Sequence, residues 1–281
     1  MITLHIDGDI LLYRCGFAVE KRVVTQTEEG TESHLEIGTT AEGIEYLDSV
    51  ISFIRSLVAH DHYKIYLSGD KNYRKNVATI LEYKGNRKRS RKPVHYDALK
   101  THIVNEHPYE YVQGQEADDA LGIALTRDGD SAIVASSDKD LLMIPGKHLI
   151  LKHKLEESHL VTISEDQGRH NFWLQMLEGD KTTDNIMGCP QVGKKRARKH
   201  LEHLKGKSDL DYWRVVRRVY LEQFKARPPE GFRLEGETVF YPSWRTGAEM
   251  SKNIDEYLTE IGQLLYIRKT PMEMWFPPKG D

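Results

Sequence analysis

Short apolar runs alternate with longer helical patterns along the first 165 residues. Five of these runs predict β-strands: Thr3–Asp7, Lys64–Leu67, Ser131–Ser136, His148–Lys152 and Val161–Ser164. Between them, Ala41–His60 carries apolar residues at helical spacing, and Glu116–Thr126 is a second helix candidate. Strands that alternate with helices are typical of an α/β fold built on a mostly parallel sheet.

The pattern changes beyond about residue 165, where helical periods dominate. Helices are expected at Trp173–Glu178, Lys194–Leu204, Leu210–Lys225 and Ile254–Tyr266. The stretch Arg227–Tyr241 carries Pro228, Pro229 and two glycines and predicts a loop or hairpin insertion. We therefore expect an α/β core over residues 1–165 and a helical region over 166–281.

Composition narrows the class of protein. Hydrophobic residues make up 39% of the 281 residues, enough for a sizeable core, and charged residues make up 30%. There is no apolar run of about 18 residues and no signal-peptide pattern at the start, so neither a membrane span nor a membrane partner is expected. Cys15 and Cys189 suggest no disulfide framework. These features indicate a cytoplasmic protein.

The formal net charge of −3 conceals a segregated charge pattern. Lys84–Lys92 reads KGNRKRSRK, with six basic residues in nine, and Lys194–Lys199 reads KKRARK, with five in six. Acidic centres between basic segments suit an enzyme that acts on a polyanion. The alternative is that both basic runs are merely solvated faces.

Acidic residues gather at predicted strand ends and helix starts. These positions are Asp7 and Asp9, Asp70, Glu116 with Asp118 and Asp119, Asp138 and Asp140, and Asp180 and Asp184. Ligand sites in parallel sheets lie beyond the carboxyl ends of the strands, where Asp7, Asp70 and Asp138 are expected. Asp118 points away from its two neighbours on an ideal helix unless it lies in an irregular first turn.

So many converging carboxylates would repel one another without cations. Hard oxygen ligands favour Mg²⁺ or Mn²⁺, and two such ions ~3.5–4 Å apart can support phosphoryl chemistry. Taken singly, an Asp at a strand end is more often a helix cap or a turn former. Several such clusters together are harder to explain in that way.

Five motifs appear in an order that points to one family. HIDGDILLYR, LEYKGNR, EADD, DKDL and GDKTTDN resemble the motifs of the bacteriophage and bacterial 5′–3′ exonuclease and flap endonuclease family, over roughly residues 3–200. The short length resembles the stand-alone phage type. The resemblance implies a PIN-like 5′ nuclease core, a helical arch at about 72–105 and a helix-hairpin-helix C-terminal region. It also implies metal-dependent hydrolysis of DNA at 5′ ends, nicks or flaps, with RNA–DNA hybrids as a further substrate and 5′-phosphate products.

The same resemblance implies roles for individual residues. Asp7, Asp70, Glu116, Asp118 and Asp119 would hold one ion, and Asp138, Asp140, Asp180 and Asp184 the second. Lys84 would contact the scissile phosphate, Tyr83 would stack on a base, and Arg74 would bind phosphate. Gly188–Gly193 would form a duplex-binding hairpin, helped by K⁺ in relatives. The nucleic-acid-binding candidates are Arg87, Lys88, Gly193, Lys194, Lys195 and Arg198.

Two departures and three alternatives remain open at this point. Gly179–Asn185 has one residue more than the usual motif, which affects the role of Asp184, and Asp9 is an additional acid. HIDGD also fits a haloacid-dehalogenase-like phosphatase, but that activity would leave EADD and DKDL unused. A PIN-like ribonuclease would share the carboxylates, and a non-catalytic DNA-binding protein would share the basic segments. The 13 histidines, His102 and His107 included, show no metal-ligand spacing, and the oligomeric state is undetermined.

Overall fold

The computed structural model describes residues 1–27, 30–89 and 91–279, and the side chains of 25–27, 30, 32, 88 and 89 lie outside that description. The chain divides into two compact units, each formed from three segments. Unit 1 comprises residues 1–70, 90–137 and 146–162, and unit 2 comprises 71–89, 138–145 and 163–281. The changeover after Thr162 falls near the expected boundary at 165, but two earlier segments also group with the C-terminal part.

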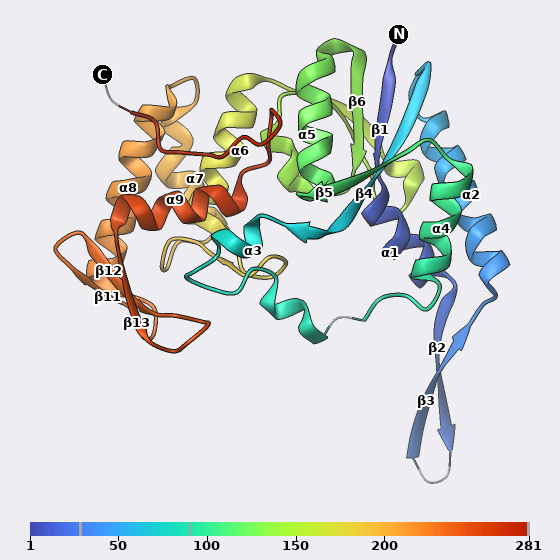
Figure 1. Cartoon of the computed structure of the whole chain (residues 1–281), viewed down its shortest axis with the longest axis horizontal. Coiled ribbons are helices and arrows are strands. Elements are labelled where there is room, and N and C mark those ends of the chain that lie inside the picture. Colours follow the sequence, from blue (N-terminus) through green and yellow to red (C-terminus); the bar gives the residue numbers. More distant parts are fainter. Residues whose placement is uncertain (28–29, 90, 280–281) are drawn as a thin grey trace. The chain divides into compact units, whose positions relative to one another are not determined.

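A six-stranded sheet with the order β5-β4-β1-β6-β7-β8 is built mainly from unit 1 (Figure 1). The strands are β1 (Thr3–Asp7), β4 (His62–Asn72), β5 (Tyr109–Gly114), β6 (Ala132–Ser136), β7 (Gly146–Ile150) and β8 (His159–Ile163). The pairs β1–β4, β1–β6 and β6–β7 are parallel. All four positions of β1 from Leu4 to Asp7 are buried, as expected for a central strand covered on both faces.

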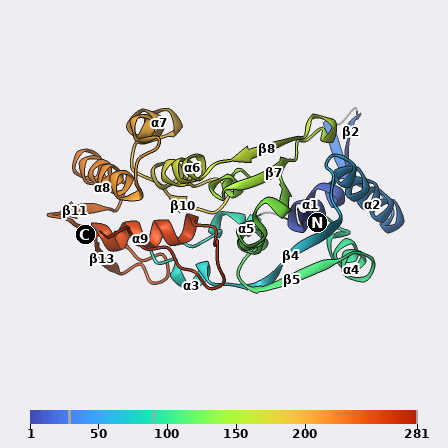
Figure 2. The same cartoon turned by 90° about the horizontal axis from the view of Figure 1, so that it is seen from above.

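Four helices accompany the unit 1 sheet: α1 (Gly8–Ala18), α2 (Thr40–Ser56), α4 (Tyr96–Glu106) and α5 (Ala117–Asp128). Helices α2 and α4 lie side by side in two orthogonal views (Figures 1 and 2). Their buried residues, among them Leu47, Ile51, Leu99 and Ile103, belong to one apolar cluster with the β1 residues Leu4 and Ile6. This burial fixes both helices on the sheet.

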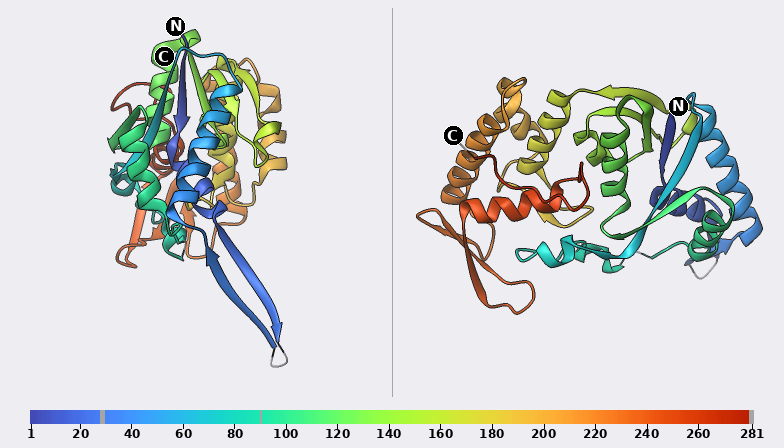
Figure 3. Two further views of the ribbon diagram at one scale, coloured as in Figure 1. Left: turned by 90° about the vertical axis from the view of Figure 1, so that its right-hand side faces the viewer. Right: turned by 45° about the horizontal axis from the view of Figure 1, so that its top comes forward.

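An antiparallel hairpin, β2 (Glu20–Thr27) and β3 (Gly30–Ile37), extends from α1 and α2 (Figure 3, left). Its exposed apolar positions include Val24, Leu35 and Ile37. The sequence pattern did not predict it, because none of the side chains described in these two strands is buried. The short edge strand β5 was likewise missed.

Unit 2 is mainly helical. It contains α3 (Arg74–Val77), α6 (Glu165–Glu178), α7 (Lys194–Leu201), α8 (Asp209–Ala226) and α9 (Ile254–Leu265). Its strands are β9 (Gly179–Asp180), β10 (Ile186–Met187), and the small antiparallel sheet β11 (Arg233–Glu235), β12 (Thr238–Pro242) and β13 (Glu249–Asn253). Short 3₁₀ turns occupy Gly85–Arg89, Lys139–Met143 and Glu202–Leu204. The core is aromatic, with Trp173, Tyr212, Tyr220, Phe224 and Tyr257 almost completely buried.

The structure confirms the predicted mostly parallel sheet and its flanking helices. The prolines and glycines near 228–236 accompany the predicted insertion, which forms the sheet β11-β12-β13. The segment 72–105, expected as a helical arch, contains the four-residue α3, the 3₁₀ turn at Gly85–Arg89 and α4. No helix within the described ranges is long and apolar enough to cross a membrane.

Candidate metal centres and nucleic-acid interface

Asp7 lies where β1 ends and α1 begins. One of its carboxylate oxygens accepts the backbone N–H of Ile10 at 3.2 Å, which caps the helix, and the other accepts the hydroxyl of Ser136 at 2.8 Å. A side chain at Gly8 would place its Cβ only 2.6 Å from the carbonyl oxygen of Tyr66. Glycine after Asp7 therefore allows the helix to start directly at the strand end, and Ser136 links Asp7 to the end of β6.

Ser68 on β4 joins two further acidic segments to this edge of the sheet. Its backbone N–H donates to Asp9 at 3.1 Å, and its hydroxyl accepts the backbone N–H of Ala117 at 2.8 Å. The start of α5 is thereby held beside the end of β4. Asp70 follows two residues later and is exposed. The end of β1, the second half of β4 and the start of α5, which carry the acids of unit 1, therefore lie at one edge of the sheet.

The motif EADD forms the first turn of α5. Glu116 is the N-cap, its backbone N–H donates to Asp119 at 3.1 Å, and the reciprocal contact completes a capping box. Asp119 is fully buried, whereas Glu116 and Asp118 are half-buried. Asp118 lies in this first turn, as its participation requires. Carboxylates here are also stabilised by the positive end of the helix dipole.

A second acidic group lies in unit 2 and begins with the motif DKDL. Asp138 caps the 3₁₀ turn by accepting the backbone N–H of Asp140 at 2.8 Å. The carboxylate of Asp140 accepts from the Gln175 amide at 2.8 Å and lies 3.4 Å from the Lys139 ammonium. Burial, together with the nearby charge of Asp138, raises the pKa of Asp140 to about 7 despite the opposing effect of Lys139.

Asp180 and Asp184 border the loop between β9 and β10. Asp180 is buried and accepts the backbone N–H of Thr183 at 2.9 Å and the Thr182 hydroxyl at 3.3 Å. These contacts shape the loop that contains the extra residue noted in the sequence. Both carboxylates also contribute to the raised pKa of Asp140, so the four acids of this unit form one electrostatic group.

Asp184 is surrounded by the expected phosphate-binding residues. Its carboxylate accepts the Tyr83 hydroxyl at 2.8 Å and an Arg87 guanidinium N–H at 2.7 Å, and it lies 3.7 Å from the Lys84 ammonium. The Lys84 backbone N–H donates to the carbonyl of Asp184 at 2.9 Å. Lys84 has a φ of 57°, a conformation that is uncommon for a residue other than glycine. The motif YKGNR therefore encloses an anion, here supplied by the chain itself.

Two buried ionic side chains fix the segment that carries Tyr83 and Lys84. Glu260 on α9 accepts the backbone N–H groups of Thr79 and Ile80 at 2.7 and 2.8 Å. The guanidinium of Arg74, itself 2% exposed, donates to the carbonyls of Leu264 and Tyr266 at 2.9 and 2.7 Å. Arg74 therefore holds the backbone in place, which differs from the expected phosphate contact.

Tyr83, which was expected to stack on a base, lies beside Lys84 and is enclosed by the protein. Its side chain is buried, at 5% exposure, and its hydroxyl holds Asp184. Its ring contacts the Lys84 ammonium at 5.1 Å from the centroid. The ring thus supports Lys84 by a cation–π contact and offers little surface for a stacked base.

The basic run KKRARK forms α7, with Gly193 as its N-cap. Ala197 and Leu201 are buried, whereas Lys194, Lys195, Arg196, Arg198 and Lys199 are exposed. Gly193 has open space around it, and no side chain caps the helix start. The result is an amide-bearing helix end next to exposed cations, both of which favour phosphate. The side chain of Lys88 lies outside the described residues.

The donor chemistry of both acidic groups suits divalent metal ions. The donors are carboxylate oxygens, which Mg²⁺ and Mn²⁺ prefer. Burial first, and then the negative charge of Asp138, raise the pKa of Asp140, and a bound cation would favour its ionised form.

No family model and no curated protein sequence matches this chain. Solved structures do match. The bacteriophage T5 D15 protein co-crystallised with metal ions superposes with a TM-score of 0.52 at 17% identity, over 79% of this chain and 85% of that one. The T5 5′-exonuclease with bound zinc gives a TM-score of 0.52 at 16% identity over the same shares. This chain has the fold of the phage 5′ nucleases. At this identity the likeness concerns the fold alone.

Several residues that contact the acidic side chains were not predicted from the sequence. Ser68, Ser136 and Gln175 each hold an acidic residue or its segment. Single serines and glutamines carry no spacing signal, so only the fold reveals them. Lys139 was detectable, because it lies between the two acids of DKD.

Proposed function

We propose that this protein is a metal-dependent 5′ nuclease that hydrolyses DNA phosphodiesters at 5′ ends, nicks or flaps. The observation that carries the proposal is that every acidic motif lies at a strand end or at the start of a turn or helix, and that within unit 2 Lys84 and Arg87 already enclose the carboxylate of Asp184. The T5 proteins that share the fold are a 5′-exonuclease and a protein crystallised with metal ions, which supports the same activity.

We assign one divalent ion to each acidic group. In unit 1 the ligands are Asp7, Asp70, Glu116, Asp118 and Asp119, and in unit 2 they are Asp138, Asp140, Asp180 and Asp184. Mg²⁺ or Mn²⁺ bound there would activate water and neutralise charge on the phosphate. We assign Asp9 a structural role, because its carboxylate accepts the backbone N–H of Ser68.

Lys84 and Arg87 are assigned to the substrate phosphate. In the structure both cations lie at Asp184, whose carboxylate presents the same oxygen chemistry as a phosphate ester. An incoming phosphate would compete for these cations and gain charge stabilisation that grows as the bond breaks. Arg74 and Tyr83 would act indirectly, by fixing the segment that carries Lys84.

The exposed cations of α7 and the backbone at Gly193 are assigned to duplex DNA. Contacts of this kind bind phosphates and convey no base identity, so cleavage should depend on DNA structure more than on sequence. The turn Gly188–Gly193 before α7 is the place for a K⁺ ion if one assists binding.

Cleavage of a 5′-labelled flap duplex, a nicked duplex and a single-stranded RNA, each with Mg²⁺ and with EDTA, tests the proposal. We expect Mg²⁺-dependent cutting of the two DNA substrates to products with a 5′-phosphate. Cutting of RNA alone would replace the proposal with a PIN-like ribonuclease. Tight duplex binding without cutting would leave a non-catalytic DNA-binding protein.

A further inference from the structure

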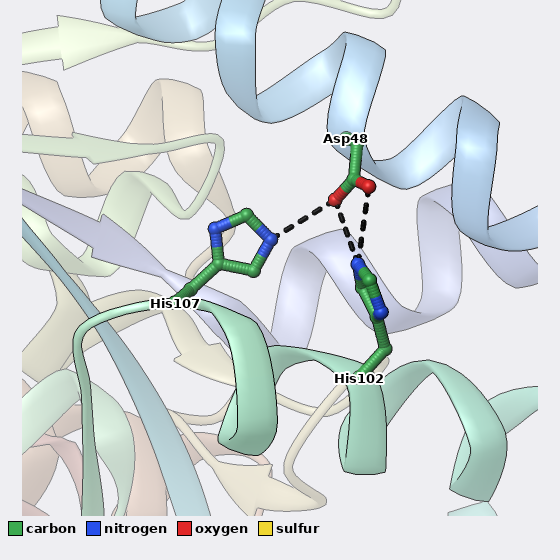
Figure 4. Close-up of side chains that lie close together, drawn as sticks. All are labelled: Asp48, His102 and His107. Atoms are coloured by element: carbon green, nitrogen blue, oxygen red, sulfur yellow. Dashed lines mark hydrogen bonds and ion pairs between the residues drawn. The ribbon is translucent and has the colours of Figure 1, made fainter.

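Three side chains of unit 1 outside the acidic groups converge on one point (Figure 4). The Nε2 of His102 lies 2.9 and 3.1 Å from the two carboxylate oxygens of Asp48. The Nε2 of His107 lies 2.9 Å from one of those oxygens. Each of the three residues offers one ligand atom, and these three atoms all lie within 4.8 Å of one another.

Helix packing explains why these residues meet. Leu47 and Ile103 are buried in the same apolar cluster, and Asp48 and His102 are their immediate neighbours on α2 and α4. The two polar residues therefore lie at the rim of the helix contact. His107 follows the last residue of α4, and its ring returns to the same carboxylate. The histidine side chains are 17% and 12% exposed, and Asp48 is 45% exposed.

The donor set differs in kind from the acidic groups. Two imidazole nitrogens and one carboxylate oxygen suit zinc and related borderline ions, whereas Mg²⁺ takes oxygen ligands. Ligand bonds of ~2.0–2.1 Å in a tetrahedral site place neighbouring donor atoms about 3.3 Å apart. The two separations of 2.9 Å between a histidine nitrogen and the Asp48 oxygen would need to widen by about 0.4 Å on this geometry.

A hydrogen bond behind the cluster orients one of the rings. The Nδ1 of His107 lies 3.1 Å from the hydroxyl of Tyr63, whose ring stands 4.2 Å below the Arg55 guanidinium. When Nδ1–H donates to that hydroxyl, the lone pair of Nε2 faces the cluster. Metal-bound histidines are usually fixed in this way through their second nitrogen.

We infer that Asp48, His102 and His107 form a binding site for one zinc-class divalent ion, which links α2 to α4 and keeps water at its exposed side. The inference rests on unit 1 alone and does not depend on the proposed nuclease activity. The five-residue spacing of the two histidines shows no ligand pattern by itself. Their partner comes from a helix more than 50 residues earlier, so spacing cannot reveal it.

Titration calorimetry of the full chain with ZnCl₂, in saturating Mg²⁺ after removal of bound metal, tests the site. We expect one more zinc per chain in the wild type than in the double variant His102→Gln with His107→Gln. The exposed His203→Gln is the matched control and should bind as the wild type does. Tyr63→Phe should weaken the zinc affinity about 10–100-fold.

Electron paramagnetic resonance of bound Cu²⁺ gives a second readout. The wild type should show two nitrogen ligands at this site and His107→Gln should show one, a difference that overall stability does not produce. Equal zinc stoichiometry in the wild type and the double variant would overturn the inference. Identical Cu²⁺ spectra for the wild type and His107→Gln would also overturn it. The three residues would then form only an ion pair between two helices.

Discussion

Two pairs of acidic residues, one pair in each unit, are held in contrasting ways. In unit 1, Asp7 and Asp119 are almost fully buried and bound to backbone N–H groups at helix starts. In unit 2, Asp140 and Asp184 contact side chains, namely Gln175 and the cations Lys139, Lys84 and Arg87. Asp7 and Asp119 are therefore held by the local backbone, whereas Asp140 and Asp184 are held by neighbouring side chains.

This difference shows how one chain can combine a rigid ligand set with an adjustable one. Backbone caps fix carboxylates without further positive side chains. Side-chain ion pairs can exchange partners when a metal ion or a phosphate arrives. We therefore expect substitutions of Asp7 and Asp119 to affect folding as well as metal binding, and substitutions of Asp140 and Asp184 to affect mainly chemistry and pH dependence.

Apart from the loss of a metal ligand, the largest expected effect concerns Lys84. Lys84→Ala should reduce turnover about 10²–10³-fold, as removal of one electrostatic stabiliser does in well-studied sites, with duplex binding nearly retained. Lys75→Ala, an exposed lysine on α3, is the control for lost charge alone. Single-turnover cleavage measures both. Equal rates for Lys84→Ala and the wild type would remove Lys84 from the chemistry.

The pH dependence of the unfolding free energy should reveal the raised pKa of Asp140 in unit 2. The folded-state pKa of Asp140 is raised from 3.8 to about 7, so the metal-free folded chain binds more protons than the unfolded chain between these values. Stability from this group is present below about pH 4 and is lost as the pH rises to about 7, with a slope approaching about 1.4 kcal/mol per pH unit.

Urea unfolding in EDTA across this range measures the effect. Asp140→Asn should remove that part of the slope, because the amide stays neutral. Parallel slopes in the variant and the wild type would show that Asp140 ionises normally. Mn²⁺ should also bind more weakly below pH 7 in the wild type, since binding must release the proton.

A direct comparison of Asp119 and Asp184 tests the contrast between the units. Asp119→Ala removes a buried capping-box acceptor and should cost about 1–2 kcal/mol of unfolding free energy. Asp184→Asn keeps an acceptor for Tyr83 and loses only ion pairs with partly exposed cations, so it should cost less than about 1 kcal/mol. A larger loss of unfolding free energy in EDTA for Asp184→Asn than for Asp119→Ala would contradict this contrast between the units.

The smallest effect is expected on α7. Lys195→Ala and Arg198→Ala should each weaken duplex binding without changing the cleavage position, and each lost phosphate contact should lower the salt-dependence slope by about 1. Lys225→Ala, at the exposed end of α8, should leave the slope unchanged. Anisotropy titrations at several salt concentrations supply the data. An unchanged slope would mean that α7 is a solvated face.

Much of the fold could be predicted from local patterns. Buried runs such as Leu4–Ile6 gave correct strands, because a central parallel strand is apolar throughout. Helix α6 begins at Glu165, eight residues before the expected Trp173, although Ser164 and Gln167 form the capping box that marks its start. That signal was readable in the sequence.

The site was only partly predictable, for a physical reason. Acidic motifs at strand ends could be placed, because parallel strands end at one edge. The burial of Arg74 and Tyr83 could not, since it depends on the carbonyls of Leu264 and Tyr266 and on Asp184, all far along the chain. The cluster of Asp48, His102 and His107 could not be predicted either, because its members are brought together from distant parts of the chain.

The most direct test of the central claim is Mg²⁺-dependent cleavage of a 5′-labelled flap duplex by the wild type and by Asp138→Asn. Asparagine keeps an oxygen that can accept the Asp140 N–H, so the turn should persist while a metal-binding charge is lost. Asp130→Asn, an exposed acid outside both groups, is the control. We expect the wild type and the control to cut near the flap junction with Mg²⁺ and not in EDTA. We expect Asp138→Asn to bind the duplex normally and not to cut it. Undiminished cutting by Asp138→Asn, or cutting by the wild type in EDTA, would contradict the central claim.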